Sequence, residues 1–199
     1  ESAYDGTWTQ FPKPKDLISM IGDFDLVYIS HIHPDHYDYE TLSLLFNHFG
    51  QKEIMIADWG NSPNYLQRKI ESDGLGSNLL ISNRKIINDT IITIVPNKTD
   101  SISDIDSAII VTSNKRKKSI LNINDCVYNH DHFNSILKVK NDLATEFTLF
   151  CLGFTGAGPY PQTYYSPITQ EKILIEKANI KKNNFFQRYK KAVQAMPSI

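Results

Sequence analysis

The segment that organises this chain reads Leu26-Val27-Tyr28-Ile29-Ser30-His31-Ile32-His33-Pro34-Asp35-His36. Its first part is apolar, with β-branched and aromatic side chains, which predicts a short buried strand. At the end of a strand, side chains two positions apart point to the same side, so His31 and His33 can converge on one ion. The proline that follows ends the strand, which leaves Asp35 and His36 able to reach a neighbouring point. Imidazole and carboxylate groups are ligands of zinc, iron and manganese, so the segment predicts a metal site.

The composition is that of a single globular domain. The chain has 199 residues, 41% of them hydrophobic, which is enough for one domain with a real core. A net charge of -1 argues against a dedicated nucleic-acid surface or anionic-membrane surface. We find no apolar run long enough for a membrane span and no signal peptide. Cys126 and Cys151 are too few for a disulfide framework, so we expect a reducing, cytoplasmic location.

Periodicity and turn residues predict an α/β order in the first part of the chain and an antiparallel meander in the middle. Asp38 is the expected N-cap of a helix that ends at Gly50. Helices are expected over residues 15–20, 38–50, 63–70, 133–143 (with Asp131 or Asn134 as cap) and 171–196, and strands over 25–30, 52–57, 85–88, 90–95, 107–112, 119–123 and 148–152. The last helix carries an apolar stripe, which we expect to pack into the core: Phe185, Phe186, Tyr189, Val193 and Met196.

Several further residues are candidates for the site. Asp125 follows the strand expected over 119–123, where it could cap a turn or reach the metal site. His130 and His132 could contact substrate or relay protons near the metal, or simply belong to a polar loop. The other candidates for substrate contact are Trp8, in an aromatic loop that could instead be packed surface, and Gly156, Gly158 and Tyr160, in a glycine-rich loop that could instead be a structural turn.

The HxHxDH spacing at positions 31–36 resembles the first metal motif of the metallo-β-lactamase superfamily. The resemblance assigns His31 and His33 to one metal position, and Asp35 and His36 to a second. In that superfamily a later strand ends in an aspartate that bridges the two metals, and Asp125 resembles it.

Within the superfamily, the chain is most similar to the metallo-domain of the cytidine-monophosphate N-acetylneuraminate hydroxylase family. The segments that carry this likeness are residues 26–36, 108–111, 119–126 and 156–161. The likeness implies a four-layered αββα sandwich over residues 1–199, with mixed, largely antiparallel sheets, outer helices and the metals at one edge.

The chain departs from the family pattern in three ways. It has no set of Cys and His ligands for the Rieske iron–sulfur cluster that the hydroxylases carry before the metallo-domain. It also has no histidine between residues 49 and 129, where the superfamily supplies a further ligand. Asn97, Asp100, Asp104 or Asp106 would have to substitute for it. Finally, the opening strands and the last strand of the full fold are expected to be missing, so we expect a fragment of a larger protein.

Three functions remain open. The first is a hydrolase that uses one or two zinc or iron ions to activate water against an ester, phosphoester or amide, with Asp35 and His36 as catalytic residues. The second, which the hydroxylase likeness implies, is an iron-dependent oxidoreductase that acts on an N-acyl sugar nucleotide and takes electrons from a separate Rieske-type protein or companion domain. The third is a metal-free relative that binds a ligand. The first two act on a small-molecule substrate, whereas the third would bind a sugar nucleotide or a protein partner.

Overall fold

The computed structural model describes residues 2–3, 8–9, 12, 16–60, 62–99, 105–153, 161 and 164–196, with the backbone alone at 2–3 and 8–9. Helices and mixed sheets alternate along the chain, so the expected α/β class is confirmed. Three sheets are present in the described part: a small antiparallel pair formed by β1 (Ser2–Ala3) and β2 (Trp8–Thr9), a three-stranded sheet and a five-stranded sheet.

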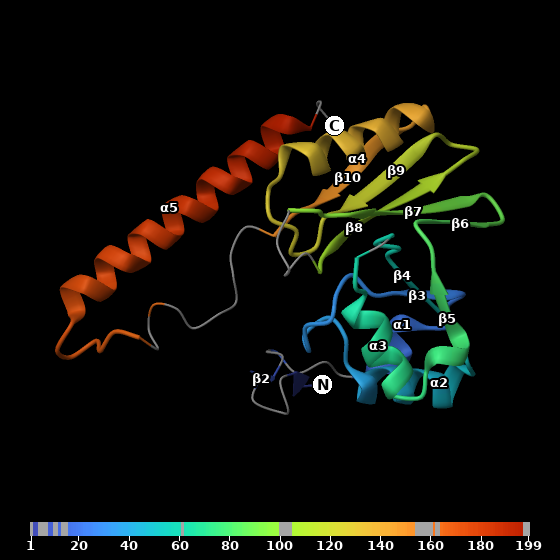
Figure 1. Cartoon of the computed structure of the whole chain (residues 1–199), viewed down its shortest axis with the longest axis horizontal. Helices are drawn as coiled ribbons and strands as arrows, with labels where there is room; N and C mark the ends of the chain where they lie inside the picture. Colours follow the sequence, from blue (N-terminus) through green and yellow to red (C-terminus); the bar gives the residue numbers. More distant parts are fainter. Residues whose placement is uncertain are drawn as a thin grey trace.

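The three-stranded sheet is wholly parallel, in the order β3-β4-β5. Its strands are β3 (Leu26–Tyr28), β4 (Glu53–Ile56) and β5 (Leu79–Ile81). Parallel neighbours need a crossover connection, and the helices α2 (Tyr39–Phe49) and α3 (Tyr65–Ser72) provide it, as Figure 1 shows. Before this sheet lies α1 (Leu17–Ile21), and the 3-10 turn η1 (Gly76–Asn78) leads into β5.

The five-stranded sheet has the order β10-β9-β8-β7-β6. Its strands are β6 (Arg84–Ile87), β7 (Thr90–Pro96), β8 (Ser107–Ser113), β9 (Lys118–Asn122) and β10 (Glu146–Cys151). The four strands from β6 to β9 pair antiparallel, so the predicted meander is confirmed. β10 instead pairs parallel with β9, because the helix α4 (His130–Asp142) carries the chain back to the same end of the sheet.

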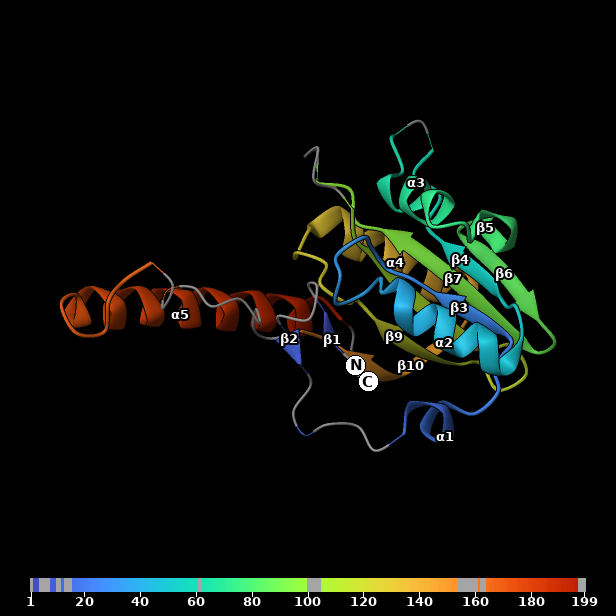
Figure 2. The ribbon, with the colours of Figure 1, turned by 90° about the horizontal axis from the view of Figure 1, so that it is seen from below.

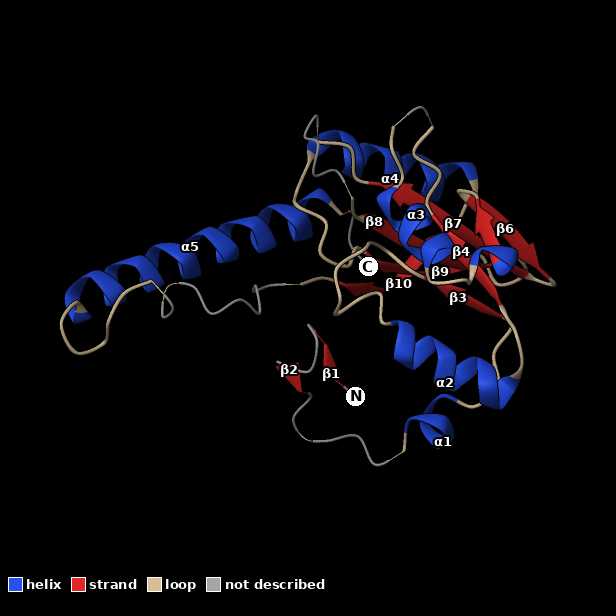
Figure 3. Cartoon of the chain, turned by 60° about the horizontal axis from the view of Figure 1, so that its bottom comes forward, coloured by secondary structure: helices blue, strands red, loops and turns tan. Residues whose placement is uncertain are grey.

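The core lies in three clusters that follow the two large sheets. On one face of the three-stranded sheet, buried side chains of α2 and α3 pack against Ile54 and Ile56. On its other face, Met55 packs against Ile92 of the five-stranded sheet. Along β7 the side chains alternate, so Val95 turns the other way and packs against the cluster that holds α4. Helices therefore cover the outer sides of the two sheets, as Figure 3 also shows.

The last helix, α5 (Glu171–Ala195), extends away from the sheets, and its final turns lie against the body of the molecule (Figures 1 and 2). Met196, just past its end, is buried at the end that meets α4. Phe186, Tyr189 and Val193 are 60%, 40% and 43% exposed, so the prediction that they pack into the core is wrong. The prediction is confirmed for Met196, and Phe185 is half-buried, so the stripe is only partly covered within the described part of the chain.

Two local predictions have clear outcomes. Asp38 caps α2 as expected, because its side chain accepts a hydrogen bond from the Thr41 amide at 2.8 Å. The predicted cap of α4 is wrong: Asn129 accepts from the Asp131 amide, so the helix starts earlier than its hydrophobic pattern suggests.

Among the described residues, no helix combines the length and the apolar composition that a membrane crossing requires.

Candidate metal centre

The histidine loop is shaped by a tight turn directly after β3. The strand itself ends at Tyr28, and the Ile29 amide still donates to the Met55 carbonyl of β4. The His33 carbonyl then accepts hydrogen bonds from the amides of both His36 and Tyr37, at 2.9 and 2.8 Å. This turn reverses the chain and brings the ring of His36 back to within 4.2 Å of the ring of His31, measured between centroids.

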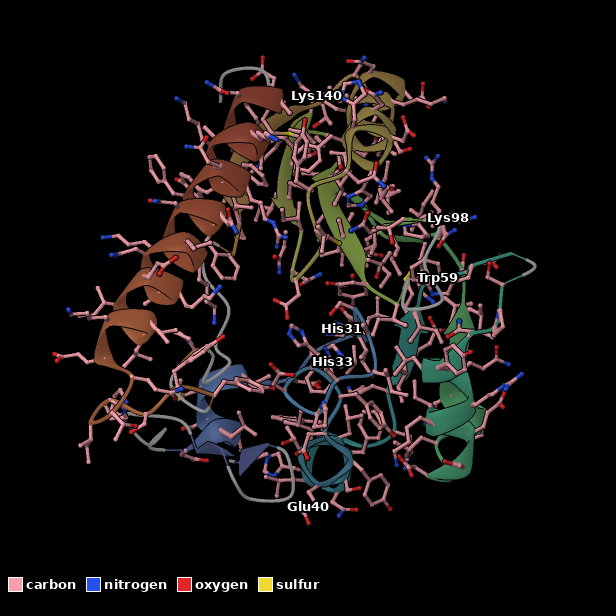
Figure 4. All side chains as sticks on the ribbon, turned by 60° about the vertical axis from the view of Figure 1, so that its left-hand side comes forward. His31, His33, Glu40, Trp59, Lys98 and Lys140 are labelled. Atoms are coloured by element: carbon pink, nitrogen blue, oxygen red, sulfur yellow. The ribbon has the colours of Figure 1, made fainter. Side chains whose placement is uncertain are left out.

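Four of the five predicted ligands form two close pairs. The Nε2 atom of His31 lies 2.8 Å from Nδ1 of His33, and Nε2 of His36 lies 3.3 Å from Oδ2 of Asp125. His31, His36 and Asp125 each offer an atom within 4.8 Å of the other two, which makes them a possible metal-binding group. Figure 4 shows His31 and His33 next to each other on the loop after β3.

The contact distances fit the size of a divalent ion. Two ligand atoms about 2.05 Å from one ion are about 2.9 Å apart at a right angle and about 3.3 Å apart at the tetrahedral angle. The separations of 2.8 Å in the His31–His33 pair and 3.3 Å in the His36–Asp125 pair agree with these values. Asp35 is the fifth predicted ligand, and its Oδ2 atom lies farther out, 3.9 Å from Nε2 of His36.

The side chains of the histidine group and its two carboxylates differ widely in exposure. The side chain of His31 is 1% exposed, His36 is 25% exposed, Asp35 is 32% exposed and Asp125 is 58% exposed. His33 is also exposed. A buried imidazole therefore forms the floor of the group and carboxylates form its rim, so a small molecule in solution can reach it.

A buried polar network lies beneath the floor and joins the two large sheets. The Ser107 side chain donates to the Ser30 carbonyl at 3.0 Å, and the Tyr28 hydroxyl donates to the Ser107 carbonyl at 2.8 Å. Burial raises the pKa of Tyr28 well above its usual range, so the phenol stays neutral and acts as a hydrogen-bond donor. The hydroxyl of Ser30 contacts Nδ1 of both His31 and His36, at 3.0 and 3.2 Å.

Asp125 reaches the histidines because the chain turns sharply after β9. Asn124 has a φ of 50°, a left-handed conformation that asparagine tolerates better than most residues. Its side-chain amide donates to the Ser107 carbonyl at 2.8 Å, which ties this turn to the same network. The neighbouring Cys126 is buried, and burial, together with the negative charges of Asp106 and Asp125, raises the pKa of its thiol. In this structure Cys126 is therefore a neutral, packed side chain.

The predicted substrate residues lie apart from the histidine group or beyond the described part. His130 is exposed and lines a hollow of about 310 Å³ between α4 and α5. His132 is 3% exposed, and its Nε2 atom lies 3.0 Å from the Val95 carbonyl. Trp8 lies in β2, where only the backbone is described. The glycine-rich loop is outside the described residues: Gly156, Gly158 and Tyr160. A role for these six residues in substrate binding stays a prediction.

The residues considered as substitutes for the missing histidine differ in their position relative to the group. Asn97 is buried and donates its side-chain amide to the Val127 carbonyl at 3.0 Å. Asp100 and Asp104 lie outside the described residues. Asp106 is the one that contacts the group, with Oδ1 3.4 Å from Nδ1 of His31.

Sequence reasoning missed the residues that support the group from below. Ser30 directly precedes the first histidine of the metal motif, so its place beside two imidazoles could have been expected. Nothing in the sequence marks Ser107 or Tyr28, because their contact depends on the packing of one sheet against the other.

Comparison with known proteins gives one partial similarity. No family model matches the chain. A segment of 53 residues is 38% identical to a protein named cytidine monophosphate-N-acetylneuraminic acid hydroxylase from Asterias rubens. The segment covers 27% of this chain and 8% of that hydroxylase, so the two proteins are alike over a small part of the hydroxylase's length.

Proposed function

We propose that this chain is a metal-dependent enzyme whose metal centre is built from the loop after β3 and the turn after β9. The observation that carries the proposal is the convergence of His31, His36 and Asp125 from two different sheets. We also propose that the helix-covered pair of sheets corresponds to the αββα sandwich of the metallo-β-lactamase superfamily.

The contacts support a division of the ligands into two pairs. His31 and His33 suit one ion, because Nε2 of the first and Nδ1 of the second are 2.8 Å apart. His36 would suit a second position together with Asp35, and Asp125, whose Oδ2 atom lies 3.3 Å from Nε2 of His36, would contribute a carboxylate there. The donor set of nitrogen and oxygen atoms fits zinc and iron.

The first candidate reaction is hydrolysis of an ester, phosphoester or amide. A divalent ion bound here supplies Lewis acidity, because it polarises the scissile group and lowers the pKa of coordinated water toward about 7. The chain itself contributes a rigid floor, since His31 is buried and hydrogen-bonded from below. Asp35 is the exposed carboxylate beside His36, so it is placed to orient an incoming water and to accept its proton.

The second candidate reaction is hydroxylation, and the partial likeness to a hydroxylase favours it. Two histidines and one carboxylate are the donor set of many non-haem iron oxygenases. Among the described residues this is the one group of three or more His, Cys, Asp or Glu side chains that could hold a metal. For this reaction we propose a separate Rieske-type protein or companion domain as the electron donor and an N-acyl sugar nucleotide as the substrate.

Elemental analysis of protein purified without added metal separates these reactions. Zinc together with turnover of generic phosphoester or ester substrates supports the hydrolase. Iron, together with oxygen consumption in the presence of a reductant, supports the hydroxylase. His31→Ala should abolish metal retention in both cases, whereas His48→Ala, which removes an exposed histidine on α2, should leave it unchanged. Protein that holds neither metal would contradict the proposal and support a metal-free, ligand-binding relative.

A further inference from the structure

Asp106 lies next to the histidine group, on the opposite side from the predicted ion. It directly precedes β8, and its Oδ1 atom accepts a hydrogen bond from the Ser107 amide at 2.7 Å. The same Oδ1 atom lies 3.4 Å from Nδ1 of His31. Its side chain is 13% exposed, and its Oδ2 atom is buried and has no hydrogen-bond partner among the described residues.

The two ring nitrogens of His31 face different neighbours. Nε2 faces Nδ1 of His33 at 2.8 Å, whereas Nδ1 faces Asp106 and the hydroxyl of Ser30. The lone-pair directions of the two nitrogens diverge across an imidazole ring. An ion held between His31 and His33 therefore lies across the ring from Asp106. Asp106 cannot be a ligand of that ion, so it does not take the place of the missing histidine.

We propose that Asp106 is a positioning residue for the metal centre: it holds the proton of His31 on Nδ1 and so turns the lone pair of Nε2 toward the ion. A histidine ligand commonly donates its second ring N–H to a carboxylate, which fixes both its tautomer and its ring orientation. This inference rests on the proposed metal-binding function. It adds a residue that the metal motif does not contain.

The surrounding contacts favour this arrangement. Ser30 has one hydroxyl proton and lies near Nδ1 of both His31 and His36. If both histidines bind metal through Nε2, both Nδ1 atoms carry protons, and the serine oxygen must accept from them. Asp106 also brings a carboxylate oxygen to 3.4 Å from Nδ1 of the buried His31, and its negative charge favours an N–H over a lone pair at that nitrogen. The Ser107 side chain donates to the Ser30 carbonyl, and this holds the start of β8 against the histidine loop.

A structural role is the competing explanation, because Asp106 also accepts from a backbone amide. Asp89 offers a matched control: its Oδ1 atom accepts from the Lys115 amide at 2.8 Å, in the turn at the other end of β7 and β8. Asp89→Ala removes a similar carboxylate–amide bond without touching the histidines. Asp106→Ala removes the acceptor, and Asp106→Asn keeps an oxygen that can accept from Nδ1.

The first test reads the position of the histidine proton in metal-free protein, by long-range proton–nitrogen NMR. The proposal predicts that His31 of the wild type carries its proton on Nδ1. Asp106→Ala should shift population to the Nε2-protonated form, whereas Asp106→Asn and Asp89→Ala should stay close to the wild type. A His31 proton on Nε2 in the wild type would overturn the proposal, whether or not any variant folds.

The second test measures the dissociation constant for Zn²⁺ by competition with a chromogenic chelator. Loss of an outer-shell partner typically weakens metal affinity by about 10–100-fold, so Asp106→Ala should fall in that range. Asp106→Asn should recover most of the affinity, and Asp89→Ala should bind like the wild type. Unchanged affinity in Asp106→Ala would refute the positioning role while leaving the proposed function intact. A wild type that binds no Zn²⁺ or iron would instead refute the proposed function, and the NMR result alone would then decide how Asp106 acts on His31.

Discussion

The Nε2 atom of His36 lies 3.3 Å from the Oδ2 atom of Asp125, although the two residues follow strands of different sheets. His36 comes from the turn after β3 and Asp125 from the turn after β9. This contact joins the histidine loop to the second sheet, because it adds an acidic oxygen closer to Nε2 of His36 than that of Asp35, which lies 3.9 Å away.

Removal of the distant carboxylate should therefore weaken metal binding. We expect Asp125→Ala to lose more affinity for Zn²⁺ than the roughly 10–100-fold that an outer-shell residue contributes. Asp142→Ala is the matched control, because Asp142 is an exposed aspartate that pairs with Lys138 on α4, away from the histidines. Competition titration measures both. Equal affinity in the two variants would show that Asp125 is not a ligand.

Truncation of a side chain in β9 should lower stability strongly on the buried face of the strand and little on the exposed face. Leu121 is 0% exposed and packs in the cluster with Ile110 and Ile136, whereas its neighbour Ile120 is 44% exposed. Leu121→Ala should lower the free energy of unfolding by about 2–5 kcal/mol, through lost burial and a residual cavity. Ile120→Ala should cost about 1 kcal/mol or less. Urea denaturation followed by circular dichroism gives both values. Similar losses in the two variants would contradict the burial of Leu121 and the exposure of Ile120.

Loss of the N-cap of α2 should have a moderate effect on the free energy of unfolding. The Asp38 side chain accepts from the Thr41 amide, and its own helix carries the buried Leu42, Leu45 and Phe46. Asp38→Ala should reduce the free energy of unfolding by about 1 kcal/mol, whereas Asp38→Asn should restore most of it. A loss in Asp38→Asn as large as in Asp38→Ala would mean that the charge matters and the cap does not.

The buried His132 predicts a pH dependence of stability. Burial lowers its pKa below the ordinary value of 6.5. At pH values below about 6.5 the unfolded chain binds a proton that the folded chain resists, so stability is lost as the pH falls from there toward the lowered folded pKa. His132→Gln keeps a donor for the Val95 carbonyl but cannot take up that proton.

We therefore expect the wild type to lose more stability than His132→Gln between pH 7.5 and pH 5.5. The difference between the two proteins at each pH isolates the contribution of His132, because the other histidines are common to both. Chemical denaturation at the two pH values measures it. Parallel loss in the two proteins would assign the acid sensitivity to other groups.

The first strand, the histidine loop and the following helix could be predicted from the sequence because their signals are local. Asp38 and Gly50 bound α2 in both the prediction and the structure. The strand β5 was missed, since Leu79–Ile81 is too short to show a pattern. The tail was misread for a different reason: a stripe such as Phe186 and Tyr189 indicates that a helix is amphipathic, but not what covers it.

The site shows the same limit. The sequence placed His31 and His33 together by strand alternation. The strand ends at Tyr28, however, so it is the loop after β3 that brings Nε2 of His31 and Nδ1 of His33 to 2.8 Å. The sequence could also suggest Asp125, since a strand end delivers it. It offered four substitutes for the missing histidine with no means to choose. The contact of Asp106 with Nδ1 of His31 arises from the packing of one sheet on the other, which no local pattern encodes.

The most direct test of the central claim is to locate the ion itself. Crystals grown with Zn²⁺ or Fe²⁺ and measured at the absorption edge of the metal should show an anomalous peak about 2.0–2.2 Å from nitrogen atoms of His31 or His36 and an oxygen of Asp125. A peak at that place would support the proposed centre. Metal-containing crystals with no peak between these three side chains, or with one only at a distant surface position, would contradict it.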